Sequence, residues 1–352
     1  MGDMIKGNDA IAEAAVRAGA ELYAGYPITP STEVMEYLSW RMPELGRTFI
    51  QAESELASIN MVLGFAACGK RALTASSGPG ISLKQEGISY ISKYRLPCVV
   101  LNVVRYGNGL GSLRSGQSDY LRDTRGGGNG DYRCIVLAPS SVQESVDLMY
   151  MAFDLAEKYR IVTEVMSESA LGQMMEPCDF PPLRELTVQE WALDGKYTHE
   201  RQVAFLENYV DTAHANNARY RDIWEREQRW EAVGVEDAEY VFVAYGIPGR
   251  VTHGVVNDLR SQGRKVGLIR PITLWPFPEK AFEAVNPKVK GFITVELNDY
   301  GQMVEDVALS VKRKLPENVS VYCLPYVFEM VKRKDIFRDF EKICQGQWKE
   351  VY

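Results

Sequence analysis

Four short segments in the first third of the chain carry residue types that bind ligands or move protons. They are Arg105 and the segments 25–33 (Gly-Tyr-Pro-Ile-Thr-Pro-Ser-Thr-Glu), 51–55 (Gln-Ala-Glu-Ser-Glu) and 76–80 (Ser-Ser-Gly-Pro-Gly). Each is expected to follow directly on a buried strand. Ligands of open α/β sheets bind beyond the carboxyl ends of the strands, so the four segments would converge on one rim.

The chemistry expected at this rim follows from the residue types. Pro30 restrains Thr29 from helical geometry, which fixes a hydroxyl and the next amides at a helix N-terminus that suits an anion. Glu53 is expected to be a partly buried carboxylate. The small residues of 76–80 let a planar ring or an anion approach the backbone. Arg105 at a strand end is suited to bind a carboxylate.

Each segment also has a purely structural explanation. The proline segment could be a rigid turn with a helix cap, and Glu53 an acid that favours the helix dipole. The glycines could form an ordinary turn, and Arg105 could lie on the surface. Only their succession on four consecutive strands favours a ligand site.

The glycine-rich loop after Arg105 raises a second possibility, a dinucleotide site. Gly107 and Gly109 match the first two positions of the fingerprint, but Ser112 occupies the third. No acid lies clearly on a following strand about 20 residues later. A loop that shapes a phosphate or substrate site is therefore favoured over a site for NAD.

The elements that must position these residues alternate between strand and helix. Apolar runs predict strands at 21–25, 48–51, 71–76, 96–105, 134–138 and 161–166, and helices lie between them at 8–18 (capped by Asn8), 31–41, 54–68, 81–94 and 141–159. After 238 the alternation returns, with strands at 240–244, 265–269, 291–296 and 319–324 and helices at 249–262, 277–284 and 301–314. This pattern predicts an α/β protein with mainly parallel sheets. We expect a first domain at 1–185, a polar helical connector at 186–235 and a second domain at 236–352.

Composition excludes several classes of protein. The chain has 352 residues and a formal net charge of −7, which does not suggest a nucleic-acid partner. Its three histidines are scattered and its six cysteines form no CxxC pair, so no metal site or iron–sulfur cluster is expected within it. No secretory signal and no apolar run of about 20 residues is found, so a cytoplasmic protein without a membrane span is expected.

With these motifs in place, the chain resembles the α subunit of 2-oxoacid:ferredoxin oxidoreductases. The resemblance rests on Tyr26-Pro-Ile-Thr-Pro30, Gln51-Ala-Glu53, Ser77-Gly-Pro-Gly80 and Arg105, and returns later as Leu274-Trp-Pro-Phe-Pro278 and Gly301-Gln302-Met303. The spacing looks most like the branched-chain (2-oxoisovalerate) type, with the 2-oxoglutarate type close behind. Where the family commonly has Arg-Gly-Gly-Pro, this chain has Arg105-Tyr-Gly-Asn108, and Arg114 follows.

The resemblance implies a fold, a reaction and roles for individual residues. It implies a thiamine-diphosphate-binding (pyrimidine-type) fold followed by a domain like the transketolase C-terminal domain, which supports assembly in such enzymes. The reaction is oxidative decarboxylation of a 2-oxoacid with coenzyme A, giving acyl-CoA, CO₂ and reduced ferredoxin. Glu53 would hydrogen-bond N1′ of the aminopyrimidine and favour the imino tautomer that removes the C2 proton. Implied substrate contacts are Tyr26, Thr29, Arg105 and Arg114; implied cofactor contacts are Pro27, Ile28, Ser77, Gly78 and Pro79.

Half of such a cofactor site is missing from this sequence. Thiamine enzymes hold the diphosphate through Mg²⁺ with Gly-Asp-Gly and a later Asn-Asn, and the nearest match here, Leu193-Asp194-Gly195 with Asn216-Asn217, lacks the first glycine. The diphosphate half, Mg²⁺ and a [4Fe–4S] cluster are thus expected on a β subunit, with γ and ferredoxin-like δ subunits and ferredoxin as further partners. Alternatives are a catalytically silent assembly subunit or a stand-alone NAD-dependent enzyme.

Overall fold

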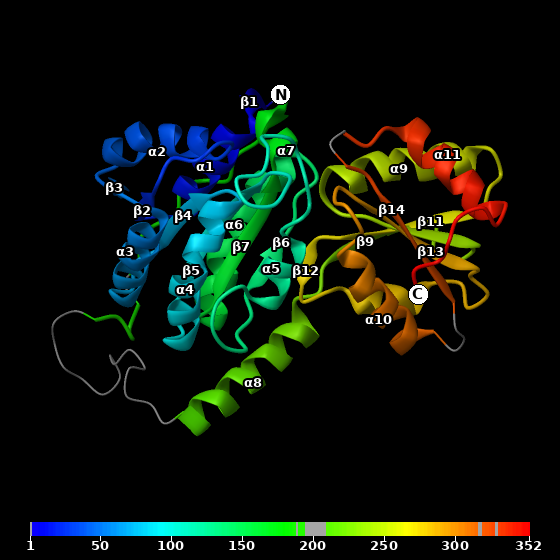
Figure 1. The fold of residues 1–352 in the computed structure, drawn as a ribbon. Coiled ribbons are helices and arrows are strands. Elements are labelled where there is room, and N and C mark those ends of the chain that lie inside the picture. Colours follow the sequence, from blue (N-terminus) through cyan, green and yellow to red (C-terminus); the bar gives the residue numbers. More distant parts are fainter. Residues whose placement is uncertain (1, 188, 194–208, 316–318, 328–329) are drawn as a thin grey trace.

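Two large sheets, each covered by helices on both faces, make up most of the chain (Figure 1). The computed structural model describes residues 2–187, 189–193, 209–315, 319–327 and 330–352. In this part of the chain the sheets have seven and five strands, and a third sheet has two. The α/β class with mainly parallel sheets is confirmed.

The seven-stranded sheet carries the segments singled out in the sequence. Its strand order is β12-β6-β7-β5-β4-β2-β3. All its pairs are parallel except that of β12 with β6. The strands are β2 (Leu22–Gly25), β3 (Thr48–Gln51), β4 (Ala72–Ser76), β5 (Cys98–Val104), β6 (Ile135–Leu137), β7 (Val162–Glu168) and β12 (Thr273–Trp275). β4, β5 and β7 are buried along their whole length, which explains their continuous apolar sequences.

Helices cover this sheet on both sides. One face carries α1 (Gly7–Arg17), α2 (Thr32–Glu44) and α6 (Val142–Tyr159), and both α2 and α6 pack against α1. The other carries α3 (Glu55–Ala67) and α4 (Pro79–Lys93), which pack on each other. The short helices are α5 (Tyr120–Arg125) and α7 (Ser169–Gln173), and β1 (Asp3–Lys6) pairs with β8 (Met175–Cys178) in the two-stranded sheet.

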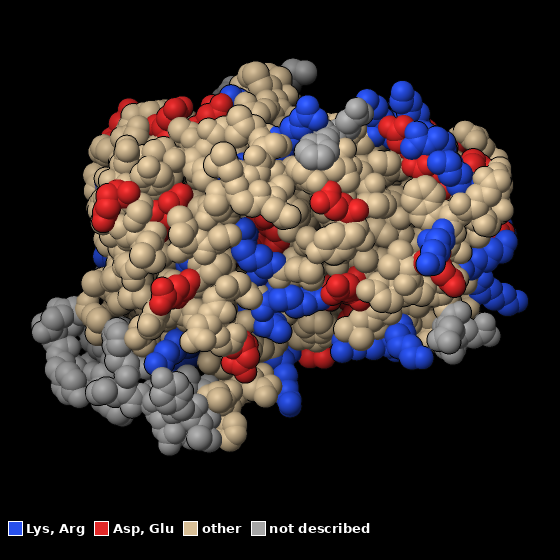
Figure 2. Space-filling view, in the orientation of Figure 1, with Lys and Arg blue, Asp and Glu red and all other residues tan. Residues whose placement is uncertain are grey.

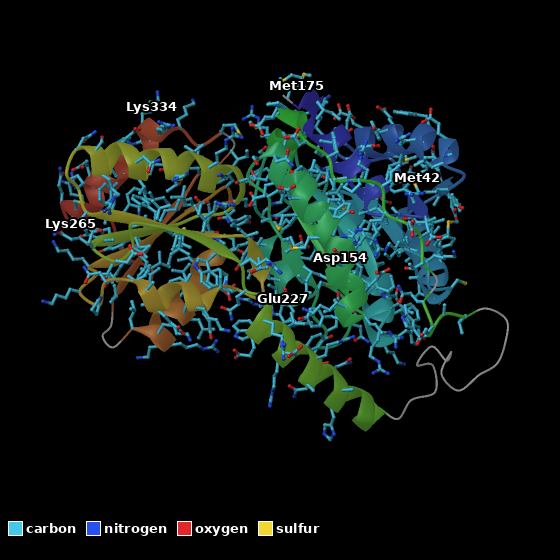
Figure 3. The ribbon with its side chains drawn as sticks, turned by 180° about the vertical axis from the view of Figure 1, so that it is seen from behind. Met42, Asp154, Met175, Glu227, Lys265 and Lys334 are labelled. Atoms are coloured by element: carbon cyan, nitrogen blue, oxygen red, sulfur yellow. The ribbon has the colours of Figure 1, made fainter. Side chains whose placement is uncertain are left out.

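The connector contains α8 (Tyr209–Arg226), and its C-terminal end is anchored to α6. The buried carboxylate of Glu227 accepts hydrogen bonds from Lys158 Nζ at 2.7 Å and Tyr159 Oη at 2.6 Å. Figure 3 shows Glu227 from behind, between α8 and the body of the molecule. The composition of the connector predicts one or two helices at about 199–231; α8 ends at Arg226, and residues 199–208 lie outside the described part.

The five-stranded sheet has the order β14-β13-β10-β11-β9, with only β9 antiparallel. Helices α9 and α11 pack together on one face, and α10 lies with the short 3₁₀ helix η2. The elements are β9 (Trp230–Val233), β10 (Tyr240–Val243), α9 (Gly246–Ser261), β11 (Val266–Pro271), η2 (Glu279–Ala284), β13 (Gly291–Glu296), α10 (Met303–Lys314), β14 (Ser320–Pro325) and α11 (Arg333–Cys344). No described helix is both long and apolar enough to cross a membrane.

One local prediction was wrong, and a second was confirmed only over a shorter range, as a 3₁₀ helix. Asn8 was expected to cap the first helix, but Lys6 is the cap residue, and Asn8 Nδ2 donates instead to Pro30 O at 3.0 Å. A helix was expected at 277–284, but the described structure is the shorter η2. The domain boundaries stay a prediction, and β12 shows that residues of the expected second domain extend the first sheet.

Candidate functional site

Four neighbouring strands bring the candidate segments to one rim. β3, β2, β4 and β5 are adjacent and parallel, so their carboxyl ends lie on the same edge of the sheet. Beyond β2 and β3 the ladder continues, since Ala52 N donates to Gly25 O at 2.9 Å. Beyond this hydrogen bond, Tyr26 follows β2 and Glu53 follows β3.

Arg105 is the central cation of this rim, and it is only 5% exposed. Its Nη1 donates to Thr29 O at 2.7 Å, and its Nη2 donates to Leu110 O at 2.6 Å. Its buried Nε has no hydrogen-bond partner. Both partners are neutral carbonyls, so the guanidinium links the first and fourth segments and keeps its positive charge for an anion.

The turn after β4 keeps space open next to Arg105. Gly78 has φ +47°, a conformation that side-chain-bearing residues rarely adopt, and a Cβ atom there would lie 3.2 Å from Arg105 Nε. A Cβ atom on Gly80 would lie 2.1 Å from Ser76 Oγ. The hydroxyls of Ser76 and Ser77 are buried and have no partner. Small residues with unpaired hydroxyls fit the approach of a flat, polar ring such as an aminopyrimidine.

The two glutamates after β3 differ in burial from what was expected. Glu53 was expected to be partly buried, but it is exposed, because it lies on the turn before Ser54, which caps α3. Glu55, in the first turn of α3, is the buried acid, and its Oε1 would lie 2.6 Å from a Cβ on Gly80. The segment Gln51-Ala-Glu-Ser-Glu55 contains both acids, but the sequence does not say which of the two side chains faces inward.

A buried lysine lies behind this turn. Lys84 of α4 is fully buried and donates to Ser58 Oγ. Burial lowers the pKa of Lys84 to about 8, and the nearby Glu55 carboxylate opposes that shift. The lysine thus links α4 to the first turn of α3, where its Nζ also donates to Glu55 O at 3.5 Å. Nothing in the sequence pattern had singled it out.

The remaining candidates line the open side of the rim. Tyr26, Thr29 and Arg114 are exposed, and Pro27 and Ile28 are half-buried. Arg114 contacts the rim through its backbone, because its carbonyl accepts from Tyr106 N at 2.8 Å. Thr29 is therefore joined directly to the Arg105 guanidinium through its backbone carbonyl.

The glycine-rich loop does not have the geometry of a dinucleotide site. β5 ends at Val104 and the next described helix begins only at Tyr120. A dinucleotide fingerprint requires its glycines to open a helix directly after a strand. Here Gly107, Gly109 and Gly111 lie in an extended loop at positive φ. The structure therefore disfavours an NAD site at this position.

A buried polar group joins this loop to the first turn of α9. The carboxyl group of Glu168, at the end of β7, accepts from Gln117 Nε2 at 3.0 Å and from Ile247 N at 3.1 Å. Burial raises the pKa of Glu168 to about 7, although these two hydrogen bonds oppose the rise. Tyr106 Oη also donates to Asp299, which raises the pKa of this phenol to about 12.

Metal-binding residues were not expected in this chain. Within the described residues, no group of three or more His, Cys, Asp and Glu side chains is placed to hold a metal ion. In the weak diphosphate-like match, Leu193, Asn216 and Asn217 are described, but Asp194 and Gly195 lie outside the described residues.

Comparisons with known proteins identify two family regions. The family described as "Pyruvate flavodoxin/ferredoxin oxidoreductase, thiamine diP-bdg" matches residues 13–235. "Pyruvate:ferredoxin oxidoreductase core domain II" matches residues 238–324. The first match covers more than half of the chain and contains every candidate site residue.

Individual relatives agree with these matches. The ketoisovalerate oxidoreductase subunit VorB of Methanothermobacter marburgensis is 46% identical over 87% of this chain and 89% of that protein. The 2-oxoglutarate synthase subunit KorA of Methanocaldococcus jannaschii is 35% identical over 88% of this chain and 92% of that protein.

A solved structure extends the likeness to three dimensions. It is a 2-oxoglutarate:ferredoxin oxidoreductase from Magnetococcus marinus with 2-oxoglutarate, coenzyme A and succinyl-CoA bound, and it is 26% identical with a TM-score of 0.83. The match covers 97% of this chain and 65% of that one, so this chain spans about two thirds of its length. The chain belongs to the 2-oxoacid:ferredoxin oxidoreductase family, as a thiamine-diphosphate-binding subunit.

Proposed function

We propose that this chain supplies the pyrimidine half of a thiamine site and the arginine that binds the 2-oxoacid. The observation that carries the proposal is the meeting of Glu53, the Ser77-Gly-Pro79 turn and the linked pair Thr29–Arg105 at the ends of four adjacent strands. Glu53 would hydrogen-bond N1′ of the aminopyrimidine. Ser77, Gly78, Pro79, Pro27 and Ile28 would surround the ring.

Thiamine diphosphate, when bound, would supply the nucleophilic C2 carbon for the chemistry at the 2-oxo group. The chain's own residues orient the substrate: Arg105 pairs with its carboxylate, and Thr29, Tyr26 and Arg114 line the open side. An arginine held by two carbonyls is fixed in direction and is not neutralised by them. Its low exposure strengthens the pairing, because water competes less for the charge.

A β subunit would complete the site and carry the diphosphate, Mg²⁺ and a [4Fe–4S] cluster. The exposure of Glu53 supports this, since a catalytic carboxylate of this kind needs a dry site that another chain must close. The face next to it also suits a partner. Residues 56–69 contain no charged side chain, yet Leu56 is 47% and Met61 37% exposed on α3. The surface over α3 and α4 in Figure 2 is mostly uncharged.

The substrate we propose is a branched-chain 2-oxoacid, oxidised with coenzyme A while ferredoxin is reduced. The VorB relative, named for ketoisovalerate, is 46% identical to this chain, whereas the KorA relative of Methanocaldococcus jannaschii, named for 2-oxoglutarate, is 35% identical. Further γ and δ subunits would complete the complex. We place it in the cytoplasm, where the free cysteines of this chain would stay reduced.

The test is Glu53→Gln in the assembled complex, with turnover and thiamine diphosphate binding measured. Turnover should fall about 10²-fold or more, the scale of general acid–base effects, while the complex keeps its iron content. Glu44→Gln, on the exposed end of α2, is the matched control and should retain normal rates.

Two results would contradict the assignment. Normal turnover of Glu53→Gln would rule out this acid and favour the silent-subunit alternative if no other residue proves essential. A collapse of turnover in Glu55→Gln, with Glu53→Gln unaffected, would transfer the catalytic role to the buried acid instead.

A further inference from the structure

The loop that follows Arg105 is held from the second domain by a segment directly after β13. Gln117 N donates to Leu297 O at 2.6 Å, and Leu297 N donates to Gln117 Oε1 at 3.1 Å. The Gln302 side chain also makes two hydrogen bonds to this region. Its Oε1 accepts from Leu121 N at 3.0 Å, and its Nε2 donates to Ser118 O at 2.9 Å. These four bonds fix the far end of the loop.

The segment that holds the loop is itself rigid. The buried Glu296 carboxylate at the end of β13 accepts from the backbone N–H groups of Gln302, Met303 and Val304, at 2.7, 2.9 and 3.0 Å. Asn298 Nδ2 donates to the same carboxylate at 2.9 Å. A side-chain carboxyl group that accepts from the first amides of α10 anchors this turn firmly. The turn can therefore position whatever it contacts.

One contact reaches from this turn to the residue next to the substrate arginine. Tyr106 Oη donates to the carboxylate of Asp299. Tyr106 also organises the near half of the loop, because its carbonyl accepts from Ser112 N at 2.7 Å and its N–H donates to Arg114 O at 2.8 Å. Leu110, within that half, supplies the carbonyl that holds Arg105 Nη2 at 2.6 Å.

We propose that Tyr106 and Asp299 are positioning residues through which the second domain sets the orientation of the oxoacid-binding arginine. The chain of contacts runs from Asp299 to Tyr106, from Tyr106 to the 107–114 loop, and from Leu110 O to the guanidinium. The inference rests on the proposed role of Arg105. It gives the second domain a part in substrate binding, beyond the assembly role implied by its resemblance to transketolase.

The geometry of the loop favours a positioning role for the Tyr106–Asp299 contact over simple docking of the two domains. Leu110 is 82% exposed, so its carbonyl stays over the arginine through the hydrogen bonds that hold the loop. These include the Tyr106 tether and two bonds with α7, from Ser169 Oγ to Leu113 O at 3.0 Å and from Ala170 N to Ser115 Oγ at 2.7 Å. Without the hydrogen bond between Tyr106 and Asp299, the loop could shift and move Leu110 O away from Arg105. The guanidinium would then lose one of the two hydrogen bonds that orient it. The effect expected is a loss of substrate affinity with no loss of cofactor binding.

The test is Tyr106→Phe in the assembled complex, which removes only the hydroxyl. Asp299 is exposed and would be hydrated, so the variant should fold and keep its iron content. The KM for the 2-oxoacid should rise about tenfold, the value of one charge-assisted hydrogen bond. kcat and the KM values for coenzyme A and thiamine diphosphate should not change.

Arg250→Gln is the matched control, because Arg250 joins the second domain to Glu176 at 2.5 Å, away from this loop. It should leave the oxoacid KM unchanged. A double-mutant cycle adds a second criterion: Tyr106→Phe combined with Asp299→Asn should be no worse than either change alone.

The outcomes separate this inference from the proposed function. If Tyr106→Phe leaves the oxoacid KM unchanged while Arg105→Met raises it, the positioning role is wrong and the arginine assignment stands. If neither change alters KM, the arginine assignment itself fails. Equal KM increases in Tyr106→Phe and Arg250→Gln would reduce the contact to ordinary domain docking and overturn the inference.

Discussion

Replacing Arg105 by methionine should separate substrate binding from the stability of the fold. Methionine keeps most of the aliphatic length and removes all five N–H donors. Two of the lost hydrogen bonds go to the carbonyls of Thr29 and Leu110. Both of those residues are exposed, so water can satisfy the freed carbonyls and little stability should be lost.

The loss of affinity is expected to be larger. A charge-assisted pair between a largely buried guanidinium and a carboxylate contributes roughly 2–3 kcal/mol, or about 30- to 150-fold in KM. The thermal midpoint of the complex should change by no more than a few degrees. kcat at saturating oxoacid should change less than KM, since the arginine binds the substrate carboxylate and not the reacting carbon.

The assay is reduction of ferredoxin or a viologen dye with coenzyme A present, at varied concentrations of 2-oxoisovalerate. Arg114→Met provides the comparison, because it makes the same change on the exposed side of the loop. A normal KM in Arg105→Met, with a large increase in Arg114→Met, would show that the substrate carboxylate lies at the other arginine. Normal KM values in both variants would refute the carboxylate-clamp reasoning altogether.

Two further changes test the turn and the buried polar group. Gly78→Ala places a side chain at φ +47° and 3.2 Å from Arg105 Nε, so it should cost about 1–3 kcal/mol and raise the oxoacid KM; an unchanged thermal midpoint and KM would contradict the geometry of this turn. Glu168 has a pKa of about 7 in the folded chain against 4.5 ordinarily, so the folded state keeps a proton that the unfolded state loses. Stability should therefore fall by about 3 kcal/mol as pH rises from 4.5 to above 7, and Glu168→Gln should abolish that dependence in denaturant titrations of the full chain at pH 5 and pH 8. Equal pH dependence in both proteins would be evidence against a buried, protonated Glu168.

The sequence was sufficient for elements whose signals are local. The strands at 48–51 and 291–296 were predicted with the bounds that the structure has, because short apolar runs flanked by turn residues define them. Ser54 and Ser141 cap their helices through their side chains, as an N-cap serine should. The convergence of the four segments followed from the rule for parallel strands alone.

Features that depend on distant partners could not be read in the same way. β1 and β8 pair from opposite ends of the first domain, and neither has an apolar run long enough to predict. Asn8 has the composition of a helix cap, but its side chain is used by Pro30 and Glu33. α11, near the C-terminus, was not predicted at all.

The site shows the same limit. The sequence predicts a rim with these residue types. The prediction that Glu53 is partly buried was wrong, because tertiary packing turns Glu55 inward instead. The partners of Arg105 are backbone carbonyls, which no residue type reveals. Asp299 follows the end of β13 and could have been found only by asking which second-domain strand ends face the first sheet.

The antiparallel pairing of β12 with β6 has a practical consequence for dissecting this protein. A fragment that stopped at the connector would lose the strand that completes the first sheet. The N–H and C=O groups of β6 that face β12 would then be unpaired, while those that face β7 would keep their partners. Such an open edge invites pairing with other molecules and precipitation. Truncations meant to isolate the cofactor-binding half should therefore retain the Thr273–Trp275 strand, for instance by a circular permutation or a linked peptide.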